Sequence, residues 1–209
     1  VELAIKARNF VRAALDGADP LAKQLRIHLH ITDTRISTQL EGYPKFFDDS
    51  RSAAIDFFSV YDLNARIVMS DYPPEQFAEV FGQGQVHIAL YHFGRLAEHV
   101  LLEAIRICHF ANGSKLRFTI FDTGENDEQV RLMLDSANLH DLCKIEHVRI
   151  TLNAHDINSI PEALLLTVTE HVVFCATDER SLEVALLLRA MLLRKTACNA
   201  PILVRMQQS

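Results

Sequence analysis

The chain has 209 residues, enough for one large domain or for one domain with part of a second. Hydrophobic residues make up 49% and charged residues 23%, which excludes the disordered, collagen-like and coiled-coil classes. The net charge is -6, and because no segment concentrates basic residues, we expect no nucleic-acid partner.

The sequence predicts a cytoplasmic protein. Four cysteines, at positions 108, 143, 175 and 198, lack C-x-x-C spacing and are too few for a disulfide framework, so we expect reduced thiols. Without a signal segment, the sequon Asn112-Gly113-Ser114 is interpreted as a chance match, and no apolar run reaches the ~18 residues of a membrane span. A helical pattern that begins at Val1 without a capping residue leads us to expect a fragment.

Residues 1–84 predict an N-terminal α+β segment. The octets Val1–Arg8 and Leu182–Arg189 share Glu, Ala and Arg in register, which favours the tail of a preceding α/β unit followed by linker helices. We expect Asp71-Tyr72-Pro73-Pro74 to end the last helix of this segment. The predicted helices run to about Leu15 and over Arg35–Leu40 and Tyr61–Met69, with Ser59 before the last, and the predicted strands are Leu25–Ile31 and Ala53–Phe57.

Residues 85–209 alternate short apolar runs with amphipathic helices, a pattern that predicts an α/β domain with a doubly wound parallel sheet. Right-handed crossovers lead us to expect the strand order 3-2-1-4-5. The predicted strands are Val86–Tyr91, Leu116–Phe121, Ile145–Thr151, His171–Ala176 and Pro201–Met206. The predicted helices are Arg95–Phe110, Glu125–Ala137, Ile160–Thr167 and Glu179–Arg194.

The turn after the first of these strands reads His92-Phe93-Gly94-Arg95-Leu96-Ala97. A dinucleotide-binding fold places G-x-G-x-x-G/A here, because glycines let the backbone approach a pyrophosphate at the helix N-terminus. Gly94 keeps the middle glycine, whereas His92 occupies the first position. Asp122 ends the second strand, the place of an acid that binds ribose hydroxyls. These residues leave open both nucleotide binding and simple close packing of strand on helix.

Residues 85–209 resemble the TrkA-N family of Rossmann domains, also called the regulator of potassium conductance (RCK) family. The matching motifs are VHIALYHFGRLAEHV, LRFTIFD, and HVVFCATDERSLEVALLLRAM followed by APILVRM. The resemblance implies a Rossmann-like fold and a cytoplasmic regulatory role in a potassium channel or transport system. It also implies binding of NAD or another adenine nucleotide, which we expect to be weak because His92 replaces the first glycine, and a membrane channel or transporter portion outside this sequence.

The resemblance further implies a set of binding residues. Carried over by position, Phe93, Gly94, Arg95 and Leu96 would lie against phosphate, His92 would crowd the pyrophosphate path, Asp122 would lie against ribose, and Thr177 with Asp178 would form the crevice rim. The segment Thr151-Leu152-Asn153-Ala154-His155 departs from the family, which usually has a Gly-Asp pair at this point.

We expect no catalysis, because the sequence has no H-E-x-x-H, G-x-S-x-G or Tyr-x-x-x-Lys motif. We also expect no metal, since only Asp33 lies near the alternating pair His28 and His30. An NAD(P)-dependent oxidoreductase and a structural assembly domain with a vestigial nucleotide site are the alternatives. Because the helix over Leu182–Leu193 is apolar around most of its circumference, we expect a homo-oligomer.

Overall fold

The computed structural model describes residues 6, 25–31, 53–108, 113–137, 139–195 and 200–206. Its contacts divide the chain into two compact units, Val1–Leu63 and Asn64–Ser209, which are described separately below. The predicted division into 1–84 and 85–209 stays a prediction. The helices expected up to Leu15 and over Arg35–Leu40 lie outside the described residues, apart from Lys6, which is helical.

The described part of the first unit holds a parallel pair of strands. Strands β1 (Leu25–His30) and β2 (Ala53–Phe58) pair from Leu25 opposite Ala53 to His30 opposite Phe58. Helix α3 (Val60–Asp71) starts after β2, and the Ser59 hydroxyl accepts a hydrogen bond from the Asp62 N–H (3.4 Å). This bond makes Ser59 the N-cap of α3.

The second unit is an α/β structure with a five-stranded parallel sheet. Its strands lie in the order β5-β4-β3-β6-β7, which is 3-2-1-4-5 when they are numbered along the chain from β3. The α/β class and the parallel sheet are confirmed, and they are consistent with a Rossmann-like fold. The strands are β3 (His87–Tyr91), β4 (Leu116–Asp122), β5 (Cys143–Arg149), β6 (Glu170–Val173) and β7 (Ile202–Val204).

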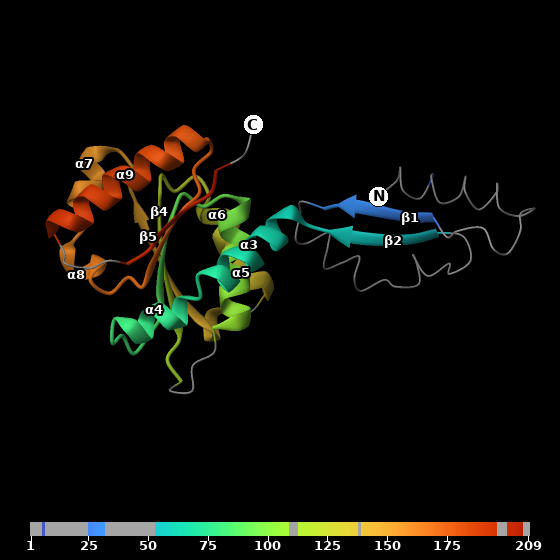
Figure 1. Cartoon of the computed structure of the whole chain (residues 1–209), viewed down its shortest axis with the longest axis horizontal. Helices are drawn as coiled ribbons and strands as arrows, with labels where there is room; N and C mark the ends of the chain where they lie inside the picture. Colours follow the sequence, from blue (N-terminus) through green and yellow to red (C-terminus); the bar gives the residue numbers. More distant parts are fainter. Residues whose placement is uncertain are drawn as a thin grey trace, which may run out of the picture. The chain divides into compact units, whose positions relative to one another are not determined.

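Helices cover both faces of this sheet (Figure 1). Helices α5 and α6 lie on one side, and α7, α8 and α9 lie on the other. The helical elements of the unit after α3 are α4 (Pro74–Val80), α5 (Arg95–Ile107), α6 (Asp127–Ala137), the short 3-10 helix η2 (Leu139–Asp141), α7 (Ala154–Ser159), α8 (Glu162–Leu165) and α9 (Asp178–Lys195). None of the helices in the described ranges combines the length and apolar composition of a membrane-crossing segment.

Two short helices were not predicted. The helix expected over Ile160–Thr167 is present as the shorter α8, but α7 precedes it, and Pro161 at the N-cap of α8 separates the two. The helix stop expected at Asp71-Tyr72-Pro73-Pro74 is also present, since α3 ends at Asp71, but the two prolines start a further helix. Pro74 is the first residue of α4, a position where a missing N–H costs nothing.

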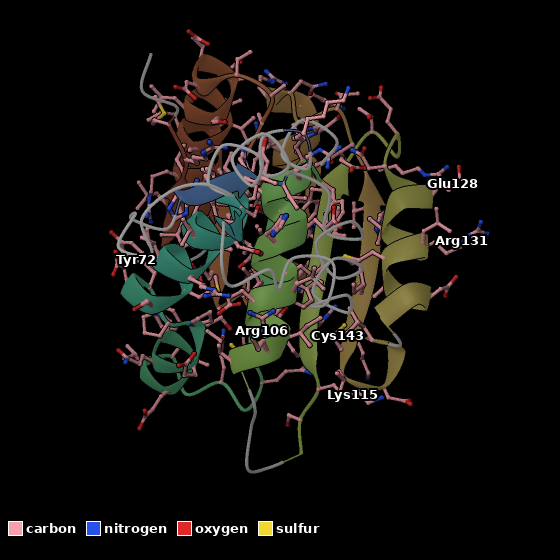
Figure 2. The ribbon with its side chains drawn as sticks, turned by 90° about the vertical axis from the view of Figure 1, so that its right-hand side faces the viewer. Tyr72, Arg106, Lys115, Glu128, Arg131 and Cys143 are labelled. Atoms are coloured by element: carbon pink, nitrogen blue, oxygen red, sulfur yellow. The ribbon has the colours of Figure 1, made fainter. Side chains whose placement is uncertain are left out.

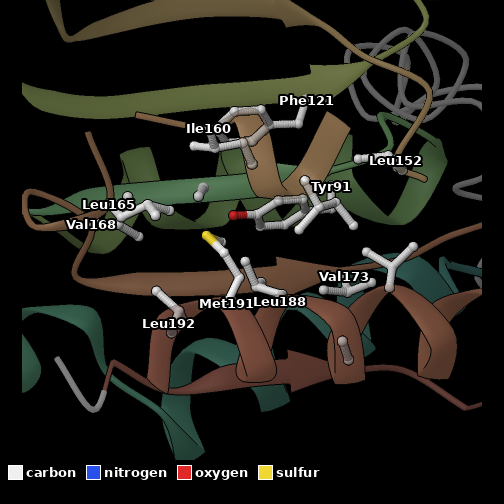
Figure 3. Close-up of a cluster of buried hydrophobic side chains, with 14 residues drawn as sticks. Tyr91, Phe121, Leu152, Ile160, Leu165, Val168, Val173, Leu188, Met191 and Leu192 are labelled. Atoms are coloured by element: carbon white, nitrogen blue, oxygen red, sulfur yellow. The ribbon is translucent and has the colours of Figure 1, made fainter. Parts of the chain in front are cut away.

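The core on the α7–α9 side of the sheet is built around two aromatic rings. Tyr91 of β3 and Phe121 of β4 are buried and stack with ring centroids 4.9 Å apart. Figure 3 shows Leu188 and Met191 of α9 extending from the helix toward this pair. Because all five β3 residues are buried, this strand is covered on both faces, as its largely apolar sequence predicts. This packing fixes the carboxyl ends of β3 and β4, where the candidate site lies.

Candidate functional site

The turn between β3 and α5 has the backbone of a glycine turn without its first glycine. His92 has a φ of 68°, in the left-handed region that residues with a Cβ adopt at a cost. Its N–H donates to the carbonyl oxygen of Phe121 (2.8 Å), which ties the turn to the end of β4. The sequence therefore replaces a motif glycine by histidine while the chain keeps a conformation that favours glycine.

Gly94 is the N-cap of α5 and, as a glycine, offers no side chain to cap this helix end. The first N–H groups of a helix and its dipole favour an anion. A Cβ built on Gly94 would lie 3.6 Å from Nε2 of His92, so the imidazole ring packs beside this glycine. The ring takes up space that a glycine at position 92 would leave open.

The other turn residues offer mainly backbone groups to a ligand. Phe93 and Leu96 bury their side chains in the core, at 0% and 4% exposure, so their side chains anchor the turn. Arg95 begins α5 and is exposed to solvent. Of the residues predicted to face phosphate, Arg95 is therefore the one that carries an exposed cationic side chain.

Asp122 ends β4 next to this turn and is almost fully buried, with 3% exposure. Its Oδ1 accepts a hydrogen bond from the Gly124 N–H (2.7 Å). Its Oδ2 is buried without a hydrogen-bond partner among the described residues. A buried carboxylate oxygen without a donor is costly, so this atom is the strongest local indication of a ligand-binding site.

A polar cluster that the sequence reasoning missed adjoins Asp122. Asp127, the first residue of α6, accepts at Oδ1 a hydrogen bond from Nδ1 of His147 (2.8 Å) and at Oδ2 one from the Arg149 guanidinium. These bonds, first that from Arg149, hold the pKa of the Asp127 carboxyl below its ordinary value. In the register of β4 with β5, Asp122 lies opposite Arg149, so the two strands bring these groups together.

Gly124 lies between Asp122 and this cluster and has a φ of 87°. A Cβ there would lie 3.0 Å from Nε of Arg149, so the arginine passes close over the glycine. Other side chains of α6 lie on the solvent side, and Figure 2 shows Glu128 and Arg131 pointing outward. Alternation of His147 and Arg149 along β5 indicates that both side chains share one face of the sheet, whereas only the register with β4 places them beside Asp122.

Thr177 and Asp178 lie at the start of α9. The Thr177 hydroxyl accepts a hydrogen bond from the Arg180 N–H (3.2 Å), and the Thr177 carbonyl accepts one from the Ser181 N–H (3.0 Å). Arg180 also donates to the carbonyl oxygen of Thr151 (3.2 Å), which links the loop after β5 to α9. These bonds give Thr177 a capping role, and among the described residues no hydrogen bond connects it to Asp122.

Comparisons of the chain with family models, with curated proteins and with solved structures found no match. The resemblance to the TrkA-N family therefore depends on the motifs quoted above.

Proposed function

We propose that the second unit is a Rossmann-like regulatory domain of the TrkA-N type that binds an adenine nucleotide, NAD or ADP, at the carboxyl edge of its sheet. In this proposal the domain acts by binding rather than catalysis, in the cytoplasm. The bound state is passed to a potassium channel or transporter portion of the parent protein.

The single observation that carries the nucleotide proposal is the unpartnered Oδ2 of Asp122. It lies at the end of β4, and the next strand of the sheet, β3, leads into the N-terminus of α5, where Gly94 is the N-cap. A ribose hydroxyl would supply the hydrogen-bond donor that Oδ2 lacks, and the α5 N–H groups would favour the phosphates. Acceptor and anion-binding groups thus occur on neighbouring strand ends, as a nucleotide requires.

The fit is incomplete at the turn. His92 packs its ring beside Gly94, so the imidazole must rotate away before a pyrophosphate can approach the backbone there. This observation favours a second candidate function, a structural assembly domain whose nucleotide site is vestigial. The two candidates differ in whether any nucleotide binds.

Calorimetric titration of the chain with NADH and with ADP distinguishes the two candidates. If the chain binds nucleotide, we expect a saturable heat of binding with a weak affinity. Asp122→Asn should lower that affinity at least tenfold, because the negative charge that accepts the ribose hydroxyl is lost. Asp141→Asn is the matched control, since it removes an exposed carboxylate just before β5, where the strand starts. No binding by the wild type and by His92→Gly at about millimolar ligand would reject the nucleotide proposal in favour of the vestigial site.

A further inference from the structure

Three side chains from three elements converge beside the carboxyl end of β4. Asp122 ends β4, Asp127 begins α6 and His147 lies on β5, and one potential ligand atom from each lies within 4.8 Å of the other two. In the ranges that the structure describes, this is the one group of three or more His, Cys, Asp or Glu side chains with such a separation. Two carboxylates and an imidazole form a donor set that Zn²⁺ accepts.

The burial of Asp122 is a second observation that points to a ligand. The Asp122 side chain is 3% exposed, and its Oδ2 has no hydrogen-bond partner among the described residues. The Gly124 N–H already occupies Oδ1 and so fixes the orientation of the carboxylate. A fixed, buried oxygen with unused lone pairs can be satisfied by a cation.

His147 contributes a ring nitrogen to the same place. Nδ1 lies 2.8 Å from Oδ1 of Asp127, and the two atoms share one proton. When that proton leaves, Nδ1 and the Asp127 carboxylate can bind the same ion, because a histidine binds a metal through a ring nitrogen that carries no proton.

Arg149 shows that the cluster attracts positive charge. Its guanidinium binds Asp127, yet its side chain is 73% exposed and can leave toward solvent. Ligand atoms around a tetrahedral Zn²⁺ are roughly 3.4 Å apart, so a pair at the 4.8 Å limit of this cluster would have to approach by about 1.4 Å. Asp127 and His147 are only partly buried, which allows this movement.

We propose that Asp122, Asp127 and His147 form a binding site for a divalent transition-metal ion of the zinc class, with Arg149 taking the place of the ion when no metal is bound. The site does not depend on the nucleotide proposal, because its ligands include no group of the β3–α5 turn. If the metal ion and the nucleotide both bind, they share Asp122, and the ion lowers the affinity for the nucleotide because it occupies Oδ2.

Calorimetric titration of the whole chain with Zn²⁺ near neutral pH, without nucleotide, tests the site. We expect one ion per chain, with Asp122→Asn and His147→Gln each weakening affinity at least tenfold. His155→Gln is the matched control, because His155 is an exposed histidine on α7. Arg149→Leu should tighten binding severalfold by removing the competing charge, a gain that adventitious binding to the cysteines would not show.

Each result decides the proposal. The same affinity in the wild type, Asp122→Asn and His147→Gln, or no binding up to about 1 mM Zn²⁺, would overturn it. Far-UV circular dichroism verifies that the variants fold, and if Asp122→Asn does not fold, His147→Gln and Arg149→Leu decide between a specific site and adventitious binding. Since no nucleotide is present, failure here leaves the nucleotide proposal standing, and failure of NADH and ADP binding leaves the metal site standing.

Discussion

His92 combines two separable effects in one residue: a strained backbone and a ring that packs beside Gly94. A left-handed φ costs a residue with a Cβ roughly 1 to 2 kcal/mol, and substitution by glycine removes this cost. The greater freedom of glycine in the unfolded chain offsets part of the stability that is gained. Position 92 is therefore where a substitution to glycine should improve both stability and ligand access.

We predict that His92→Gly raises the free energy of unfolding by about 0.5 to 1 kcal/mol and tightens ADP binding. His92→Ala is the matched control, because it removes the ring but keeps the Cβ, so it should improve binding without the gain in stability. Chemical denaturation and calorimetry measure the two quantities. A His92→Gly protein less stable than His92→Ala would contradict the assignment of strain to this residue.

Leu152 shows why the same substitution fails elsewhere. It also has a positive φ, 58°, but its side chain is 7% exposed and belongs to the core on the α9 side. Removing a buried leucine side chain costs about 2 to 5 kcal/mol, more than relief of backbone strain returns. At Leu152, burial of the side chain rather than φ therefore decides whether substitution by glycine stabilises or destabilises the protein.

At the scale of single elements, the start of α9 is held by Thr177. Its hydroxyl accepts the Arg180 N–H, one of the first N–H groups of the helix that has no partner within the helix. We predict that Thr177→Ala lowers the free energy of unfolding by about 1 kcal/mol, whereas Thr177→Ser retains most of it. Thr123→Ala, at an exposed threonine, is the control in the same denaturation series. Equal stability of Thr177→Ala and the wild type would refute the cap.

The elements that the sequence predicted best are those with one unambiguous pattern. The apolar run of β3 and the one-sided apolar face of α5 predict both elements to within a few residues. Strand β6 differs because it starts at Glu170, a fully buried carboxylic acid that a hydropathy pattern assigns to a loop. Helix α7 was missed because the Asn153 cap, whose side chain accepts the Asp156 N–H, precedes only six helical residues.

The sequence predicts those parts of the candidate site that are local motifs, but not the contacts between residues from different strands and helices. Local motifs suffice to find the turn with Gly94 and the acid at Asp122, because both are adjacent to predicted strands. Asp127 and His147 come together only through the pairing of β4 with β5 and the return of α6, which no local spacing encodes. Cross-strand register is therefore the information that the sequence pattern lacks.

At the scale of the whole molecule, buried titratable groups predict a stability maximum near neutral pH. Burial, and secondarily Arg117, lowers the pKa of His87 to about 4, and burial lowers that of His171 to about 3. Both histidines stay neutral in the folded protein. Their contribution to the free energy of unfolding is therefore fully present above pH 6.5 and is lost as the pH falls toward the two lowered pKa values. Burial, with a smaller contribution from Glu75, raises the pKa of Glu170 to about 8. The contribution of Glu170 to the free energy of unfolding is fully present below about pH 4.5 and is lost as the pH rises through 8.

We predict that the unfolding free energy is highest near about pH 6.5 and falls on both sides. Glu170→Gln should remove the decline toward pH 8 and stabilise the protein there by a few kcal/mol, on the order of 1.4 kcal/mol for each unit of the raised pKa. Urea denaturation at several pH values measures this, with Glu162→Gln as the control at an exposed carboxylate. An unchanged alkaline decline in Glu170→Gln would exclude Glu170 as its source.

Helix α9 leads us to predict self-association of the chain. Leu182, Leu186 and Leu193 are 47%, 62% and 67% exposed, and at 3.6 residues per turn they form one stripe. Leu188 and Met191 are fully buried on a different face of the helix, the one that covers the sheet, so the stripe is apolar surface that the sheet does not use. A second copy of α9 presents a matching stripe, which a two-fold contact would bury.

Sedimentation velocity over a range of protein concentrations tests this association. We expect a species larger than 23.7 kDa whose fraction rises with concentration. Leu186→Lys combined with Leu193→Lys should shift it to the monomer, because two charges would have to be buried in the contact. Leu166→Lys is the matched control, since Leu166 is 51% exposed and follows α8 instead of lying on α9. A wild-type protein that stays a single 23.7 kDa species at the highest concentration would show that the stripe does not bind a second copy.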